Sequence, residues 1–224
     1  MVASSGRPVI LSPAQEAALG RIRFGLEQPQ GIVLLCGPAG AGTSTVLAAI
    51  AAELSDRQAA DRGATAGSTT VPIWSPATLL AEHPRHVLGT TALLVDDSHL
   101  ATADECSAIA ALSAAGGDGS PGRCLVLGGR GRLLTLVGRD SRLASRVRLR
   151  AIVPPFGIQD TRRIVETRLG CAGDDVVQTC HEITGGIAAS LVRLLELAAV
   201  MAAGRQLTAD DLETIHSRLD PHAL

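Results

Sequence analysis

Up to residue 153 the chain alternates short apolar segments with segments of helical periodicity. The first helical pattern opens at Ser12 and Pro13, with Gln15 in capping-box position, and ends near Leu26. The next segment, 31–36, is apolar throughout and suits a strand buried on both faces. Strand, loop, helix and strand in this order predict an α/β fold with a mainly parallel sheet covered by helices. Further candidate strands lie at 71–74, 92–96, 124–127 and 147–153.

The pattern changes at the tandem prolines Pro154 and Pro155, which interrupt the alternation. From there to the last residue only helical periodicity is visible. We therefore expect an α/β domain over 1–153 and a small helical domain over 154–224. Two polar, glycine-bearing stretches are expected to be exposed connections. They are residues 56–70 and 114–122.

Composition removes several classes of protein. Apolar residues make up 46% of the chain, enough for a sizeable core without disulfide staples. No apolar run is long enough to cross a membrane and the first residues lack a signal core, so we expect a cytoplasmic protein. The five cysteines are scattered without C-x-x-C spacing and are expected to be buried thiols. Isolated His99 and His181 fit hydrogen-bonded side chains better than metal ligands.

All 20 basic residues are arginine, although the formal net charge is −2. Eight arginines and a single acid, Asp140, fall between Arg123 and Arg150, a local charge of +7. This segment predicts a positive face that meets nucleic-acid phosphates or an acidic partner. The alternative is a set of solvated or intersubunit arginines, favoured by the absence of an aromatic stacking pattern beside them.

A glycine-rich loop follows the first apolar strand and opens a helix, which is the context of a phosphate-binding loop. Its glycines allow close approach of backbone amides to a phosphate, and the helix start adds positive potential. Ser44 is placed to coordinate Mg²⁺, but Thr43 stands where G-x-x-x-x-G-K-[ST] requires lysine. A tight turn without ligand is the alternative. The candidate ATP- or ADP-binding residues are Gly37, Pro38, Ala39, Gly40, Ala41, Gly42, Thr43, Ser44 and Thr45.

Two carboxylates end the apolar segment "ALLVDD". Asp96 is the candidate that holds Mg²⁺ through water, and Asp97 the candidate that polarises the attacking water. By themselves, two aspartates after a strand are more often a solvated strand end. Together with the glycine loop they form a candidate site.

The chain resembles AAA+ ATPases of the ExeA-like secretion and TnsC-like transposition branch. The resemblance runs from about Leu11 to Ile215 and rests on the glycine loop, on Asp96, and on "SRLASRVRLR" and "TGGI". It implies a five-stranded parallel P-loop domain, a small helical lid, ATP between them, and assembly into rings or filaments. It also implies that Arg146 matches the arginine that relatives place near a neighbouring subunit's nucleotide, and that Arg130 loosely matches a sensor position.

Three positions depart from what the resemblance implies. Thr43 replaces the lysine that neutralises the β- and γ-phosphates, and a charge-assisted contact of that kind contributes about 1.5 to 3 kcal/mol. Asp97 replaces the catalytic glutamate and is one methylene shorter. Ala189 stands at the position of the lid arginine, with Ala188 at that of a proline. We expect contacts to the γ-phosphate to be weakened.

Three functions therefore stay open. The first is a degenerate AAA+ module with weak or absent ATP hydrolysis, acting as a regulatory or scaffolding subunit beside a protein partner, which is a second copy or another ATPase. The second is an active ATPase in which arginines replace the lysine. The third is a nucleic-acid-binding adaptor of the transposition type that uses the basic segment.

Overall fold

A computed structural model describes residues 11–28, 30–62, 70–82, 92–114, 122–170, 172–202 and 207–219. The chain forms two compact units. One comprises Met1–Gly37 and Thr43–Val153, and the other comprises Pro38–Gly42 and Pro154–Leu224. We call them the sheet unit and the helical unit. Most of the second glycine-bearing stretch expected to be a loop, 114–122, lies outside the described residues.

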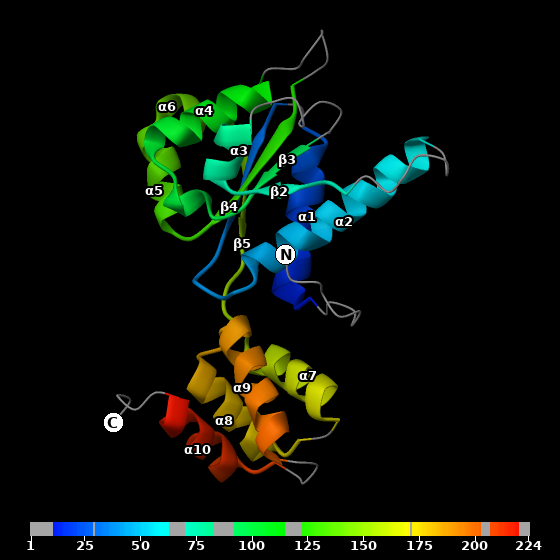
Figure 1. Ribbon diagram of the computed structural model, residues 1–224, viewed down its shortest axis with the longest axis vertical. Helices are drawn as coiled ribbons and strands as arrows, with labels where there is room; N and C mark the ends of the chain where they lie inside the picture. The colour runs from blue at the N-terminus through cyan, green and yellow to red at the C-terminus, as the bar shows by residue number, and fades with distance from the viewer. Residues whose placement is uncertain are drawn as a thin grey trace. The chain divides into compact units, whose positions relative to one another are not determined.

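The sheet unit is built on five parallel strands in the order β2-β3-β4-β1-β5 (Figure 1). All five predicted strands are present, so the expected parallel sheet is confirmed. β1, β3 and β4 are buried along their whole length, which explains their uninterrupted apolar sequences. The strands are β1 Ile32–Cys36, β2 Ile73–Trp74, β3 Ala92–Val95, β4 Cys124–Gly129 and β5 Val147–Ile152.

Helices cover both faces of the sheet (Figure 1). α1 and α2 pack on one face, where α1 contacts β1, β4 and β5 and α2 contacts β4. The other face carries the remaining helices, whose apolar side chains pack with Ile32, Leu34 and Cys36 of β1. The helices of this unit are α1 Pro13–Leu26, α2 Thr43–Arg62, α3 Pro76–Glu82, the 3₁₀ turn η2 Ser98–Leu100, α4 Ala103–Ala114, α5 Arg132–Arg139 and α6 Ser141–Arg146.

Local signals predicted α1 well and α2 only in part. The capping box of α1 is formed, with the Gln15 amide donating to Ser12 Oγ and the Ser12 amide donating to Gln15 Oε1. α2 runs to Arg62, so the expectation that residues 56–70 form an exposed connection was wrong for its first seven residues. These seven contain no glycine or proline and include good helix formers, and they extend the helix up to Gly63. Residues 63–69 lie outside the described residues.

The helical unit has its own apolar core. The side chains of Phe156, Val165, Cys180, Leu191 and Leu212 are buried together with others from all four helices. Among the described residues from Pro154 onward there is no strand, as the periodicity predicted. The helices are α7 Ile158–Leu169, α8 Asp174–Thr184, α9 Ala188–Ala202 and α10 Ala209–Leu219.

The cysteine thiols in the described part of the chain are buried, as expected, while Cys171 lies outside it. Burial raises the pKa of Cys36, Cys124 and Cys180 to about 11. At about pH 8 only about one such thiol in a thousand is ionised. We predict that these three cysteines resist iodoacetamide in the folded protein and react after denaturation. Mass spectrometry of the labelled peptides checks this, and rapid native labelling of Cys36 would contradict it.

None of the described helices is long and apolar enough to cross a membrane. Likewise, His, Cys, Asp and Glu side chains in the described ranges do not gather into a group of three that could hold a metal ion by themselves. His181 is hydrogen-bonded, with Nδ1 2.9 Å from Thr161 Oγ1, as expected.

Candidate functional site

The glycine loop connects the end of β1 with the start of α2. Its entrance is fixed by the Gly37 amide, which donates to the Gly129 carbonyl at the end of β4 (3.2 Å). Gly40 and Gly42 have φ angles of +78° and +98°, a backbone conformation that other residues rarely adopt. The chain thus uses two of its glycines to fold the backbone into the tight strand-to-helix turn that a phosphate-binding loop needs.

Side chains along the loop are small and uncharged. Pro38 and Gly40 are exposed, and Ser44 is exposed in the first turn of α2. Thr43, the first residue of α2, is partly buried and neutral at the position where the motif has lysine. The described loop therefore retains the backbone features that bind phosphate and lacks the charge.

Within the helical unit, the loop residue Gly40 is held against the start of α9. The Ala189 amide donates to the Gly40 carbonyl (3.0 Å). A Cβ on Gly40 would lie 2.9 Å from Ile187 Cγ2 and 3.1 Å from Ala189 Cβ. Ala189 thus presents a methyl group to the loop residue, at the position where the resemblance implies an arginine.

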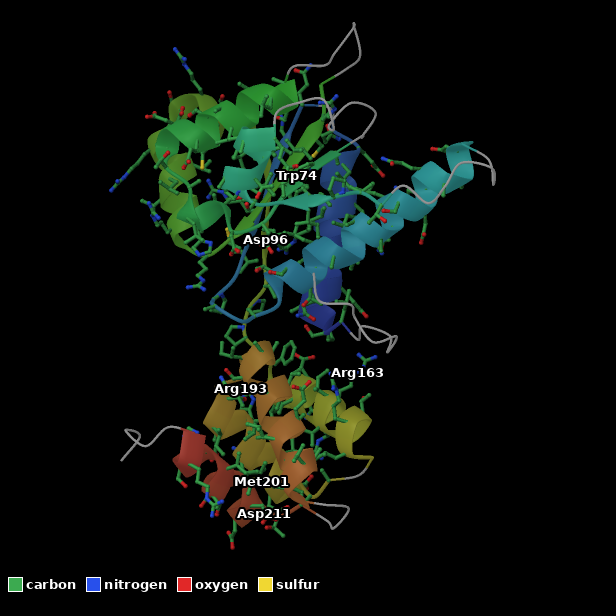
Figure 2. The ribbon with its side chains drawn as sticks, in the orientation of Figure 1. Trp74, Asp96, Arg163, Arg193, Met201 and Asp211 are labelled. Carbon is green, nitrogen blue, oxygen red and sulfur yellow. The ribbon has the colours of Figure 1, made fainter. Side chains whose placement is uncertain are left out.

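Asp96 lies where β3 ends (Figure 2), and its amide donates to the Trp74 carbonyl of β2 (2.8 Å). Its carboxylate reaches toward β4, because Oδ1 is 3.2 Å from the position that a Cβ on Gly128 would take. The same oxygen accepts the Asp97 amide at 2.8 Å. β4 separates β3 from β1 in the sheet. This places the Asp96 carboxylate at the carboxyl edge of the sheet, the edge from which the glycine loop departs.

Asp97 has a left-handed backbone, with φ 52° and ψ 24°. Aspartate enters this region more readily than longer residues, because its short side chain makes local hydrogen bonds. The conformation gives a physical reason for aspartate where the resemblance implies glutamate. The Asp97 side chain is 60% exposed, so its carboxylate is loosely held by the chain around it.

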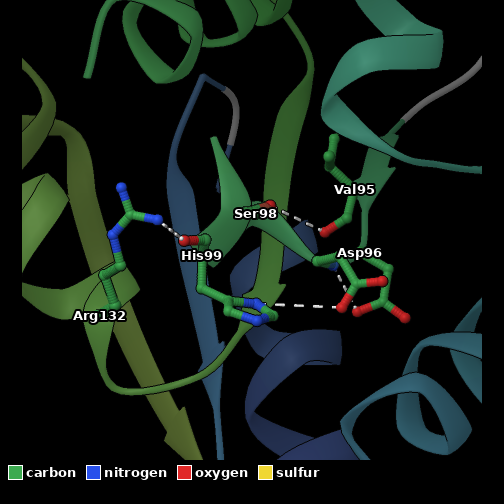
Figure 3. Close-up of polar contacts among 6 residues, drawn as sticks. Val95, Asp96, Ser98, His99 and Arg132 are labelled. Atoms are coloured by element: carbon green, nitrogen blue, oxygen red, sulfur yellow. Dashed lines mark hydrogen bonds and ion pairs between the residues drawn. The ribbon is translucent and has the colours of Figure 1, made fainter. Parts of the chain in front are cut away.

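His99 belongs to this site, and the sequence prediction missed it. Its side chain is only 9% exposed, and Nδ1 lies 3.9 Å from Asp97 Oδ1 (Figure 3). The His99 carbonyl accepts a hydrogen bond from Arg132 Nη1 (2.8 Å). The signal available in the sequence was the position of the histidine two residues after Asp97, in the turn that follows the strand.

Arg146 is not brought to the glycine loop. Its Nε and Nη2 donate to the Gln30 carbonyl (3.3 and 3.1 Å), Nη1 donates to the Ala110 carbonyl (2.6 Å), and Nη2 also donates to Ser113 Oγ (2.9 Å). Gln30 precedes β1, so this network lies at the amino end of the strands, opposite the loop. Burial lowers the pKa of the Arg146 guanidinium. The expected service to a neighbouring subunit's nucleotide stays a prediction and requires these bonds to break.

The other arginines of the basic segment are mostly exposed. Arg130 follows β4 directly, and Arg148 and Arg150 alternate with inward-facing residues on β5. Arg123 is only partly exposed. The exposed members are Arg130, Arg132, Arg139, Arg142, Arg148 and Arg150.

No protein-family model matches the chain, and no curated protein matches its sequence. Solved structures do match its fold. The ADP form of the Aeropyrum pernix ORC2 protein has a TM-score of 0.63 at 14% identity, over 96% of this chain and 71% of that one. Domain III of the Thermotoga maritima replication initiation protein DnaA has a TM-score of 0.64 at 13% identity, over 92% of both chains.

The Aeropyrum pernix ORC1 protein in complex with DNA is similar as well, with a TM-score of 0.68 at 18% identity over 95% of this chain and 67% of that one. Together with the parallel five-stranded sheet and its helices, these similarities define the class. The chain has the AAA+ P-loop ATPase fold. The likeness shows the fold, and the function of this chain has to be argued from its own residues.

Proposed function

We propose that this chain is an adenine-nucleotide-binding AAA+ module with slow or absent ATP hydrolysis, acting as a regulatory or scaffolding subunit. One observation carries the proposal: the glycine loop keeps the left-handed Gly40 and Gly42, but α2 opens with the neutral Thr43. A loop of this form favours phosphate through backbone amides and the helix start. Without the lysine, little is left to distinguish a third phosphate from two.

The residues of the site fit a nucleotide and a magnesium ion. The amides from Gly37 to Thr45 would hold the phosphates, and the Ser44 hydroxyl and the Asp96 carboxylate would hold Mg²⁺. Mg²⁺ supplies charge neutralisation between the phosphate oxygens when it is bound. Asp97 would accept a hydrogen bond from the attacking water. The helical unit, residues 154–224, would serve as the lid domain.

ADP is predicted to bind at least as tightly as ATP. The loop amides contact the α- and β-phosphates, which both nucleotides share, whereas the lost lysine and lid arginine act on the γ-phosphate. Isothermal titration calorimetry with ADP and ATP, each with and without Mg²⁺, measures the difference. Micromolar or tighter ATP binding that strictly requires Mg²⁺ would show that the γ-phosphate is recognised, and would contradict the proposal.

A second candidate function is nucleic-acid binding. Six exposed arginines on α5, α6, β5 and the end of β4 favour it, and the similar ORC1 protein was solved in complex with DNA. Binding through phosphates would weaken steeply with salt, because each neutralised phosphate releases a counterion. Fluorescence anisotropy with a DNA duplex at several salt concentrations tests this. A flat salt dependence would exclude the basic segment as a phosphate-binding surface.

An active ATPase is the remaining alternative, with an arginine in place of the lysine. Arg130 is exposed directly after β4, next to Gly129, whose carbonyl receives the loop amide of Gly37. If an arginine of a second copy supplies the charge, activity per molecule should rise with protein concentration. The cytoplasmic location, the protein partner and the secretion or transposition branch stay predictions.

A further inference from the structure

A buried imidazole nitrogen in the sheet unit has no hydrogen-bond partner. Among the described residues, His99 Nδ1 is one of two buried side-chain polar atoms in this condition. Buried polar groups are nearly always paired, so an unpaired one at the edge of a nucleotide-binding sheet needs an explanation. The nearest charged group given by the structure is Asp97, whose Oδ1 lies 3.9 Å from Nδ1 (Figure 3).

The His99 ring is held in place from several directions. Its Cβ and Nδ1 lie against Gly129, each 3.2 Å from the position that a Cβ there would occupy. The absence of a side chain at Gly129 therefore makes room for the imidazole between the ends of β3 and β4. The bond from Arg132 to the His99 carbonyl fixes the backbone of the same turn. The imidazole is thus a rigid group and the exposed Asp97 carboxylate a mobile one.

The chemistry of the pair is determined by the carboxylate, which can only accept hydrogen bonds when ionised. A favourable contact requires the proton of His99 on Nδ1. The 3.9 Å separation is longer than a direct hydrogen bond and is closed by rotation of the exposed Asp97 side chain or by one bridging water.

We propose that His99 is a positioning residue for Asp97, its Nδ1–H directing the carboxylate that orients water in the nucleotide site. This rests on the proposed function, because it assigns the orientation of Asp97 within that site. Asp97 needs such a partner since it is short, exposed and mounted on a left-handed backbone. A carboxylate that samples several rotamers places water poorly, and small misplacements in such a site lower rates strongly.

The first test reads the proton position without nucleotide. Two-bond ¹H–¹⁵N NMR at about pH 8.5, where an ordinary imidazole is neutral, reports which ring nitrogen carries the proton. His99 is identified by the signal that disappears in His99→Asn. We expect the Nδ1–H form in the wild type and a shift toward the Nε2–H form in Asp97→Ala. The Nε2–H form in the wild type, or an unchanged ring in Asp97→Ala, would overturn the proposal.

The second test separates positioning from packing. Asn can place an N–H donor near the position of Nδ1, whereas Leu keeps bulk without a donor. Under single-turnover conditions with Mg²⁺ and ATP, His99→Leu should lower the rate by about tenfold or more, and His99→Asn by less than about threefold. His216→Leu, the same substitution on α10, should leave the rate unchanged. Equal rates in His99→Leu and wild type would refute the role of His99.

Calorimetry with ADP distinguishes this failure from that of the proposed function. If His99→Leu and the wild type bind ADP equally while the rate falls, both ideas stand. If the wild type binds no nucleotide, the proposed function fails, and the ligand-free NMR experiment still decides whether His99 holds Asp97.

Discussion

Thr43→Lys is expected to raise the affinity of the glycine loop for ATP with Mg²⁺ by about 10- to 100-fold. The substitution restores a charge-assisted contact to the β- and γ-phosphates, which contributes about 1.5 to 3 kcal/mol. Since Gly40 and Gly42 already have the required backbone conformation, no rearrangement of the loop is needed. ADP affinity should rise less, because it lacks the γ-phosphate. Calorimetry on both nucleotides measures the two changes.

The matched control is Thr43→Gln, which adds length and a hydrogen-bond donor without charge. It should stay within about threefold of the wild type. If Thr43→Gln gains as much as Thr43→Lys, the missing charge is not what weakens binding. The wild type itself should turn over ATP below about 0.01 per second, since lost contacts within one site need not add. An Asp96→Ala, Asp97→Ala double variant reveals contaminating ATPases.

Arg146→Ala is expected to destabilise the sheet unit by about 2 to 3 kcal/mol. The substitution removes a guanidinium whose nitrogens donate to the Gln30 and Ala110 carbonyls and to Ser113 Oγ. Ser113 is fully buried, and acceptors that lose a charged donor away from water carry a desolvation cost. Urea unfolding followed by circular dichroism measures the loss.

Arg142→Ala provides the control for this substitution, because Arg142 lies on the same helix, α6, with an exposed side chain. It should change the unfolding free energy by less than about 0.5 kcal/mol. If instead Arg146 serves a neighbouring subunit's nucleotide, Arg146→Ala should leave stability unchanged and abolish whatever activity rises with protein concentration. The two roles therefore predict opposite pairs of results.

The fold could be predicted from the sequence because its signals are local. The capping box at Ser12 and the uninterrupted apolar segment at 32–36 determine their own elements, and the glycine loop is recognisable from spacing. The end of α2 was misplaced because a polar segment reads as a connection until a breaker is reached, and the first breaker is Gly63.

The site could be predicted only as far as its motifs. The contacts of Arg146 depend on Gln30 and Ser113, which are distant in sequence, and no local pattern joins them. The pairing of His99 with Asp97 depends on a left-handed backbone at Asp97 and on the room above Gly129. Both are tertiary features, and a single sequence carries no direct sign of either.

The two outer strands of the sheet differ in a way that bears on solubility. β2 is only two residues long, whereas β5 has six residues and carries the exposed Arg148 and Arg150. Unpaired strand edges invite other chains to extend the sheet, and very short or charged outer strands oppose that extension. Ile152 is 55% exposed on the same strand, so the arginines are what makes its neighbourhood unattractive to another strand. Replacing both by apolar residues would turn this edge into a site for aggregation.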